Sequence, residues 1–71
     1  MVVLLFKTTV RKRRNIRYVA PHLNRLIQND GKWNFDLEDQ DNVLRVVGNY
    51  TNGFKIIQTL KRLGFCCIEL F

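Results

Sequence analysis

Residues 11–14 are four consecutive cations, and they form the most chemically distinctive segment of the chain: Arg11, Lys12, Arg13 and Arg14. They follow a short apolar run and precede a helical pattern, so we expect them at a strand-to-helix turn. Such a turn exposes backbone N–H groups and the positive end of the helix dipole. A cation in the first helical turn is disfavoured by about 0.3–1 kcal/mol. The segment therefore predicts either a solvated basic loop or a docking site for a negatively charged partner.

The two cysteines, Cys66 and Cys67, are adjacent in the sequence. Neighbouring side chains on a strand point to opposite faces, so a disulfide between them would need a distorted backbone. The pair indicates a reducing, intracellular compartment, and we expect a cytoplasmic protein. Structural zinc needs four ligands with characteristic spacing, which this sequence lacks. We expect one buried thiol and one partly covered thiol, both below the loop end of the sheet.

The remaining polar residues form no convincing catalytic arrangement. His22 flanks the apolar side of a helical pattern and is expected to be a surface or boundary residue of the helix. The acidic stretch from Asp36 to Asp41 lacks the glycine and the bidentate glutamate of an EF-hand loop, so we interpret it as a solvated turn. No nucleophile with a partner base is recognisable. The sequence predicts a protein that is not an enzyme and carries no cofactor.

The composition predicts one globular domain over residues 1–71. Its hydrophobic content of 46% suits a folded chain, and a chain of 71 residues is too short for a second core. The net charge of +6 permits acidic proteins, nucleic acid or anionic lipid as partners and selects none of them. The longest apolar run, Met1–Phe6, is far shorter than the roughly 20 residues of a membrane span. We therefore expect no membrane insertion.

Hydrophobic periodicity predicts the first half of the fold. Residues 2–6 form an apolar run typical of a central strand. Apolar residues then recur at three- and four-residue steps from Ile16 to Ile27, which predicts one helix bent at Pro21. The segment Asn29-Asp30-Gly31 is expected to end it, with Gly31 available for the left-handed conformation.

The second half is predicted in the same way. Residues 33–38 alternate as a strand with Trp33, Phe35 and Leu37 inside, and residues 43–47 form the return strand of a hairpin. A second helix follows, with Thr51 or Asn52 as N-cap and Gly64 as C-terminal cap. Residues 65–70 form the last strand. The apolar face of this second helix is expected to comprise Phe54, Ile57, Leu60 and Leu63.

The predicted order is therefore βαββαβ, and each βαβ crossover should be right-handed. The compact solution is an α+β, ferredoxin-like sandwich: an antiparallel four-stranded sheet in the order 4-1-3-2, with both helices on one face. This topology places three connections at one end of the sheet. We call this end of the sheet the basic end, because it carries six cations: Arg11, Lys12, Arg13, Arg14, Lys61 and Arg62. The carboxylates of Glu38, Asp39 and Asp41 share it, and we expect them to compensate about half of its charge in weak, screened pairs.

With these elements placed, the chain resembles the heavy-metal-associated domain of copper chaperones and metal-transporting ATPases. The resemblance lies in the first strand leading into Lys7-Thr8-Thr9, the helix with Val19 and Leu23, and three further segments: Trp33–Asp39, Val43–Val46 and Ile56–Phe65. In that family the loop after the first strand carries a Met-Thr-Cys-x-x-Cys motif, whose thiolates bind soft ions such as Cu(I). Here the two ligand positions fall near Val10 and Arg13, and no cysteine precedes Cys66. The resemblance implies a degenerate member that has lost its metal.

The sequence favours a small non-enzymatic module that binds an acidic protein through the basic end. A first alternative is a heavy-metal binding or transport protein that uses Cys66 or Cys67 between two subunits. A second is a nucleic-acid-binding module, which we disfavour because the two central strands supply only Phe6 as a stacking aromatic. The sheet face without helices should expose apolar residues such as Val43 and Val47, which predicts weak homodimerisation or partner binding there.

Overall fold

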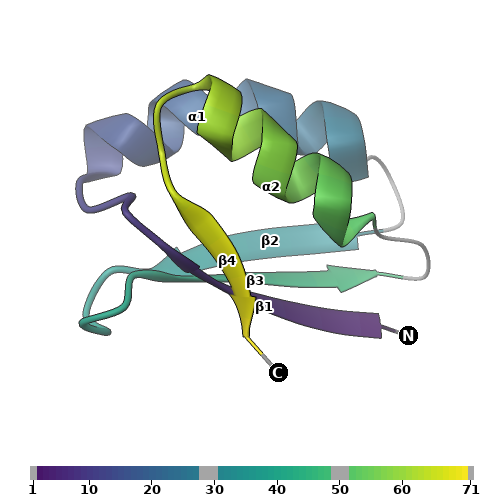
Figure 1. Cartoon of the computed structure of the whole chain (residues 1–71), viewed down its shortest axis with the longest axis horizontal. Helices are drawn as coiled ribbons and strands as arrows, with labels where there is room; N and C mark the ends of the chain where they lie inside the picture. The colour runs from purple at the N-terminus through teal and green to yellow at the C-terminus, as the bar shows by residue number, and fades with distance from the viewer. Residues whose placement is uncertain (1, 28–30, 49–51, 71) are drawn as a thin grey trace.

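The computed structural model of the chain describes residues 2–27, 31–48 and 52–70 (Figure 1). It confirms the predicted order of elements. These are β1 (Val2–Thr8), α1 (Arg13–Ile27), β2 (Gly31–Asp36), β3 (Val43–Gly48), α2 (Gly53–Arg62) and β4 (Cys67–Leu70). The structure is α+β, with both helices packed on one face of the sheet (Figure 1). No helix of the described ranges is both long enough and apolar enough to span a bilayer.

The sheet has four strands, and every neighbouring pair is antiparallel. The strand order is β2-β3-β1-β4, which read from the β4 edge is β4-β1-β3-β2. In the central pair Leu4 lies opposite Val46 and Phe6 lies opposite Leu44. Since side chains alternate along a strand, this register places all four on the helical side of the sheet.

The core lies between this side of the sheet and the two helices. Strand residues at every second position meet helix residues at three- and four-residue steps, as binary patterning requires. The buried cluster consists of Phe6, Leu44, Val46 and Cys67 from the sheet, Val19, Leu23 and Ile27 from α1, and Ile56 and Leu60 from α2. At the β2 edge Trp33 packs edge-to-face on Phe35, and its Nε1–H donates a 2.8 Å hydrogen bond to Asn24 Oδ1 on α1.

The helix boundaries confirm some predictions and correct others. Helix α1 runs without interruption through Pro21. The side chain of Asn52 accepts a hydrogen bond from the Lys55 N–H and so caps α2, while Thr51 lies outside the described residues. Gly64 has φ +98°, and the N–H of Phe65 bonds the Leu60 carbonyl at 2.9 Å. This is the Schellman arrangement expected of a helix that ends on glycine.

Two predictions are wrong, one about the burial of a side chain and one about a backbone conformation. Phe54 is 60% exposed, and Ile56 fills the core in its place. Two residues apart on a helix point to nearly opposite sides, so the inner row of Ile56 and Leu60 turns Phe54 outward. Gly31 is not left-handed but begins β2. Its backbone passes the Ile27 side chain and the Val47 carbonyl so closely that a Cβ would not fit. Asn29 and Asp30 lie outside the described residues.

The sheet face without helices, which we call the open face, is apolar toward β1 and β4. The predicted exposure of Val43 and Val47 is only partial, because both are half-buried. The more exposed apolar residues there are Val3 at 50%, Leu5 at 40%, Ile68 at 62% and Leu70 at 38%. Leu5 lies opposite Leu70, so these side chains form one patch across β1 and β4.

Candidate functional site

Backbone hydrogen bonds bring the three predicted loops together at one end of the sheet (Figure 1). The Thr8 N–H donates to the Asp41 carbonyl at 3.1 Å, which connects β1 to the β2–β3 hairpin. The Thr9 N–H donates to the Cys66 carbonyl at 3.2 Å, and the Cys66 N–H donates to Thr9 Oγ1 at 2.9 Å. The end of β1 therefore contacts the hairpin, and the connection that follows it contacts the segment after α2.

All six cations of the basic end are exposed, and two of them occupy an electrostatically unfavourable place. Arg13 and Arg14 lie in the first turn of α1, which contains no acidic residue. The Lys12 carbonyl accepts hydrogen bonds from the N–H groups of Asn15 and Ile16, so a lysine occupies the N-cap position. Lysine offers no oxygen to the remaining N–H groups of the first turn. Helix stability therefore does not explain this choice of residues.

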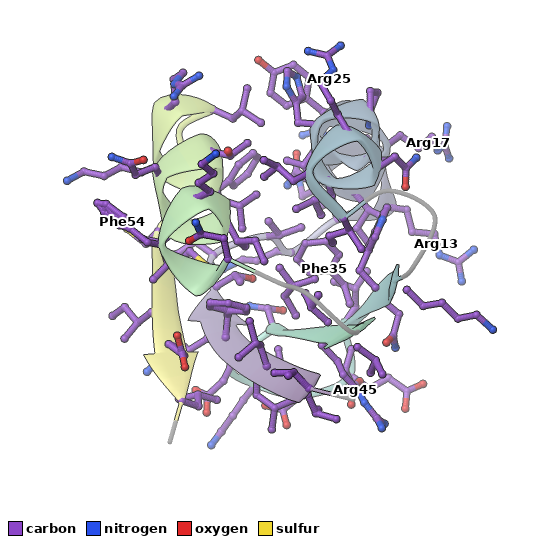
Figure 2. All side chains as sticks on the ribbon, turned by 90° about the vertical axis from the view of Figure 1, so that its right-hand side faces the viewer. Arg13, Arg17, Arg25, Phe35, Arg45 and Phe54 are labelled. Atoms are coloured by element: carbon purple, nitrogen blue, oxygen red, sulfur yellow. The ribbon has the colours of Figure 1, made fainter. Side chains whose placement is uncertain are left out.

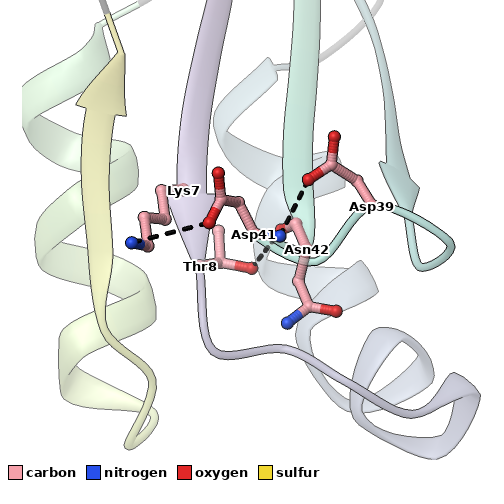
Figure 3. Close-up of polar contacts among 5 residues, drawn as sticks. All are labelled: Lys7, Thr8, Asp39, Asp41 and Asn42. Carbon is pink, nitrogen blue, oxygen red and sulfur yellow. Dashed lines mark hydrogen bonds and ion pairs between the residues drawn. The ribbon is translucent and has the colours of Figure 1, made fainter.

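The expected ion pairs between the basic end and the hairpin are absent from the described residues, so that prediction is wrong. The ion pair found there joins Lys7 Nζ to Asp41 Oδ1 at 3.5 Å (Figure 3), and Lys7 belongs to β1. The other carboxylates serve the hairpin itself. Asp36 Oδ1 accepts the N–H of Glu38, and Asp39 Oδ1 accepts the N–H of Asp41 at 2.8 Å. These local bonds hold the hairpin carboxylates close to their own turn.

The positions where the resembled family carries metal ligands hold no ligand here. Val10 is completely buried, and its N–H donates to Thr8 Oγ1 at 3.2 Å. Arg13 is exposed at the start of α1. An apolar side chain thus anchors the loop at one of these positions, and a solvated guanidinium occupies the other.

The two cysteines are free thiols in different environments. Cys67 is buried as predicted, but Cys66 is exposed and not partly covered. The last strand begins at Cys67 and not at residue 65, so Cys66 precedes β4 and lies at the loop end beside Thr9, not below it. Burial, with a smaller contribution from Glu69, raises the pKa of the Cys67 thiol to about 12. Metals bind the thiolate, so the neutral Cys67 thiol is a poor ligand at pH 7. Within residues 2–27, 31–48 and 52–70, no group of three or more His, Cys, Asp or Glu side chains could hold an ion.

The structure shows a wider charge pattern that the sequence reading missed. We define the helical layer as residues 9–27 and 52–66, which comprise both helices and their loops at the basic end. These residues contain no Asp or Glu. Five of the six carboxylates lie instead on the strands and the hairpin, and Asp30 lies outside the described residues. The helical layer holds nine cations: Arg11, Lys12, Arg13, Arg14, Arg17, Arg25, Lys55, Lys61 and Arg62.

The same layer carries two strongly exposed aromatic side chains. Tyr18 on α1 is 57% exposed and Phe54 on α2 is 60% exposed. The Tyr18 ring packs edge-to-face on His22, with ring centroids 6.4 Å apart. His22 is half-buried, as expected of a boundary residue. The signal for this surface was present in the sequence as a 19-residue stretch, residues 9–27, that lacks every carboxylate.

No known family model, curated protein or solved structure matches this chain. The relation to the heavy-metal-associated family therefore stays a prediction from the residues quoted above.

Proposed function

We propose that the protein is a small non-enzymatic module that binds an anionic macromolecule through its helical layer, with the basic end as the most cationic part. The observation that supports this is the separation of charge between the two layers. Nine cations share the helical layer without a carboxylate, and no ion pair within 4 Å engages any of them among the described residues.

The strength of this surface follows from the spacing of its charges. At physiological ionic strength, dissolved salt largely screens the interaction between exposed charges that lie more than about 8 Å apart. Arg11–Arg14 are consecutive, and Arg17 follows Arg14 by one helical turn, or about 5 Å. Their potentials therefore add, which accelerates encounter with an anionic partner.

We further propose that the fold is a ferredoxin-like sandwich derived from the heavy-metal-associated domain. Support comes from the βαββαβ order, the placement of both helices on one face, and the loop at Val10–Arg13. In this proposal the loop has lost its thiolates and kept a basic docking surface. The acidic protein expected from the sequence is one candidate partner, and a polyanion such as nucleic acid is another.

The proposed function is tested by retention on immobilised heparin, used as a generic polyanion. We expect the double variant R13E/R14E to elute at a clearly lower salt concentration than the natural chain. The matched control is K32E/R45E, which changes the net charge equally but on the open face, where strand alternation places both side chains. Figure 2 shows Arg45 on this face. Equal losses in both variants would show that net charge alone governs retention and would overturn the proposal. If the natural chain binds neither heparin nor polyglutamate at low salt, the proposal is also overturned.

A further inference from the structure

We infer that the partner of the helical layer is single-stranded nucleic acid, bound along the outer side of α1. The arginines contact backbone phosphates, and Tyr18 stacks on a base. This inference rests on the proposed function and names its ligand. From the sequence we disfavoured nucleic acid, because the central strands of the sheet supply only Phe6 as a stacking aromatic. In the structure the candidate stacking ring lies on α1 instead.

The outer side of α1 carries an exposed row of three arginines, one aromatic ring and one proline. Residues three or four apart on a helix lie on the same side. Tyr18 therefore lies one turn from Arg14, and Pro21 connects this part of the row to Arg25. Arg13 and Arg17 point outward on the side away from α2 (Figure 2). All members of the row are exposed: Arg14, Arg17, Tyr18, Pro21 and Arg25.

Tyr18 has no role in the core that would explain its size. The apolar side of α1 is completed by Val19, Leu23 and Ile27, which are all buried. Tyr18 is 57% exposed, and its contact with His22 is edge-to-face, so His22 does not cover the ring by stacking. An aromatic ring held beside guanidinium groups suits a base, since every base has a π-face.

The chemistry of the row distinguishes nucleic acid from other anionic partners. All four Lys or Arg residues of α1 are arginines. The guanidinium fork matches phosphate oxygens in a bidentate manner. A carboxylate-rich protein would also pair with arginine but would not require an exposed ring among the cations. A duplex keeps its bases stacked inside, so it offers no free base face to Tyr18.

An anionic membrane is a weaker candidate for the same surface. Interfacial helices bury a continuous apolar face in the lipid. Here the second exposed aromatic, Phe54, lies on α2 and points away from α1 (Figure 2). The two rings therefore do not form one insertable patch, and two of the exposed neighbours of Tyr18 on the outer side of α1, Arg14 and Arg17, are charged.

The inference is tested by fluorescence anisotropy with labelled oligothymidylate of about 12 nucleotides, a length within the site sizes of single-strand binders. We expect tighter binding to this strand than to a duplex of equal length. Y18L should weaken binding about fivefold or more, because base stacking on an aromatic ring is lost. F54L is the matched comparison, since it removes an equally exposed ring of the helical layer that lies outside the arginine row, and it should weaken binding clearly less than Y18L does. R17Q/R25Q should reduce the salt slope by about 1.4, as expected for two lost phosphate contacts.

The inference is overturned if Y18L binds the strand as tightly as the natural chain, or if the duplex binds as well as the single strand. Tighter binding to polyglutamate or to vesicles with phosphatidylserine would also overturn it, in favour of an acidic protein or a membrane. In each of these cases the heparin result for R13E/R14E still decides the proposed function separately. Loss of all polyanion binding in the natural chain would overturn both.

Discussion

The Thr8 hydroxyl donates a 2.6 Å hydrogen bond to the main-chain carbonyl of Asn42, 34 residues further along the chain (Figure 3). The same hydroxyl oxygen accepts the N–H of Val10. Thr8 is buried, and Asn42 has φ +49°, a left-handed conformation that asparagine tolerates better than most residues. One side chain thus fixes both the hairpin and the start of the basic loop.

We expect Thr8→Val to lower the free energy of unfolding by about 1–3 kcal/mol, because it leaves the Val10 N–H without its partner in a buried site. Chemical denaturation measures the loss. Thr9→Val is the matched control: Thr9 Oγ1 accepts the Cys66 N–H in an exposed place, where water can replace it. An equal or smaller loss for Thr8→Val than for Thr9→Val would contradict the role assigned to Thr8.

The two arginines in the first turn of α1 should lower the stability of the fold while they strengthen binding to a polyanion. Replacing Arg13 or Arg14 by Glu removes a cation from the positive end of the helix dipole and adds an anion there. We expect each change to raise the free energy of unfolding by about 0.3–1 kcal/mol at low salt, even as heparin retention falls. Thermal unfolding at low and high salt measures this, and the gain should shrink as salt rises. A loss of stability in both variants would show that these arginines support the fold.

The two apolar residues at the start of α2 should differ sharply in their contribution to stability. Ile56 is 1% exposed in the core, so Ile56→Ala should cost about 2–5 kcal/mol. Phe54 is 60% exposed, and Phe54→Ala should change stability by no more than about 0.5 kcal/mol. Denaturation of the two variants compares them directly. A large cost for Phe54→Ala would mean that its ring packs in the core.

Most of the fold could be predicted from local patterns, since these patterns are directly coupled to burial. Alternation from Trp33 onward predicted a strand, although β2 runs from Gly31 to Asp36 and leaves Leu37 in the turn. Turn chemistry at Asn52 and Gly64 specified the ends of α2. Phe54 and Ile56 could not be assigned this way, because Phe54-Lys55-Ile56-Ile57 offers apolar residues in more than one helical phase. The choice between phases depends on packing against β4 and α1, which a single sequence does not report.

The candidate site was predicted less completely than the fold. The run Arg11–Arg14 is visible in any reading, whereas Arg17 and Arg25 join it only once α1 is seen to carry them on its outer side. The predicted ion pairs of the hairpin carboxylates were also wrong. Proximity in topology indicated ion pairs, but Asp36 and Asp39 instead accept N–H groups of their own turn.

The cysteines give a prediction about pH. The pKa of the Cys67 thiol rises from 9.0 to about 12 on folding, because burial disfavours the thiolate. The unfolded chain therefore releases this proton first, and the stability that the neutral thiol contributes is lost as pH rises from about 9 toward 12. We expect the natural chain to lose more stability between pH 8 and pH 10 than Cys67→Ala does. Equal losses in the two proteins would contradict the assignment.

The open face gives the last prediction, which concerns self-association. Its apolar patch on β1 and β4 is bordered by the exposed Arg45, which lies opposite Leu5, so a second copy that buries the patch would bring like charges together. We expect only weak homodimerisation, strengthened by salt because salt screens this repulsion. Sedimentation at increasing protein and salt concentrations measures it. Ile68→Lys should abolish the association, since Ile68 is 62% exposed in the patch, whereas Phe54→Lys on the helical layer should not. A mass that stays monomeric at every concentration would show that two copies do not pair through this face.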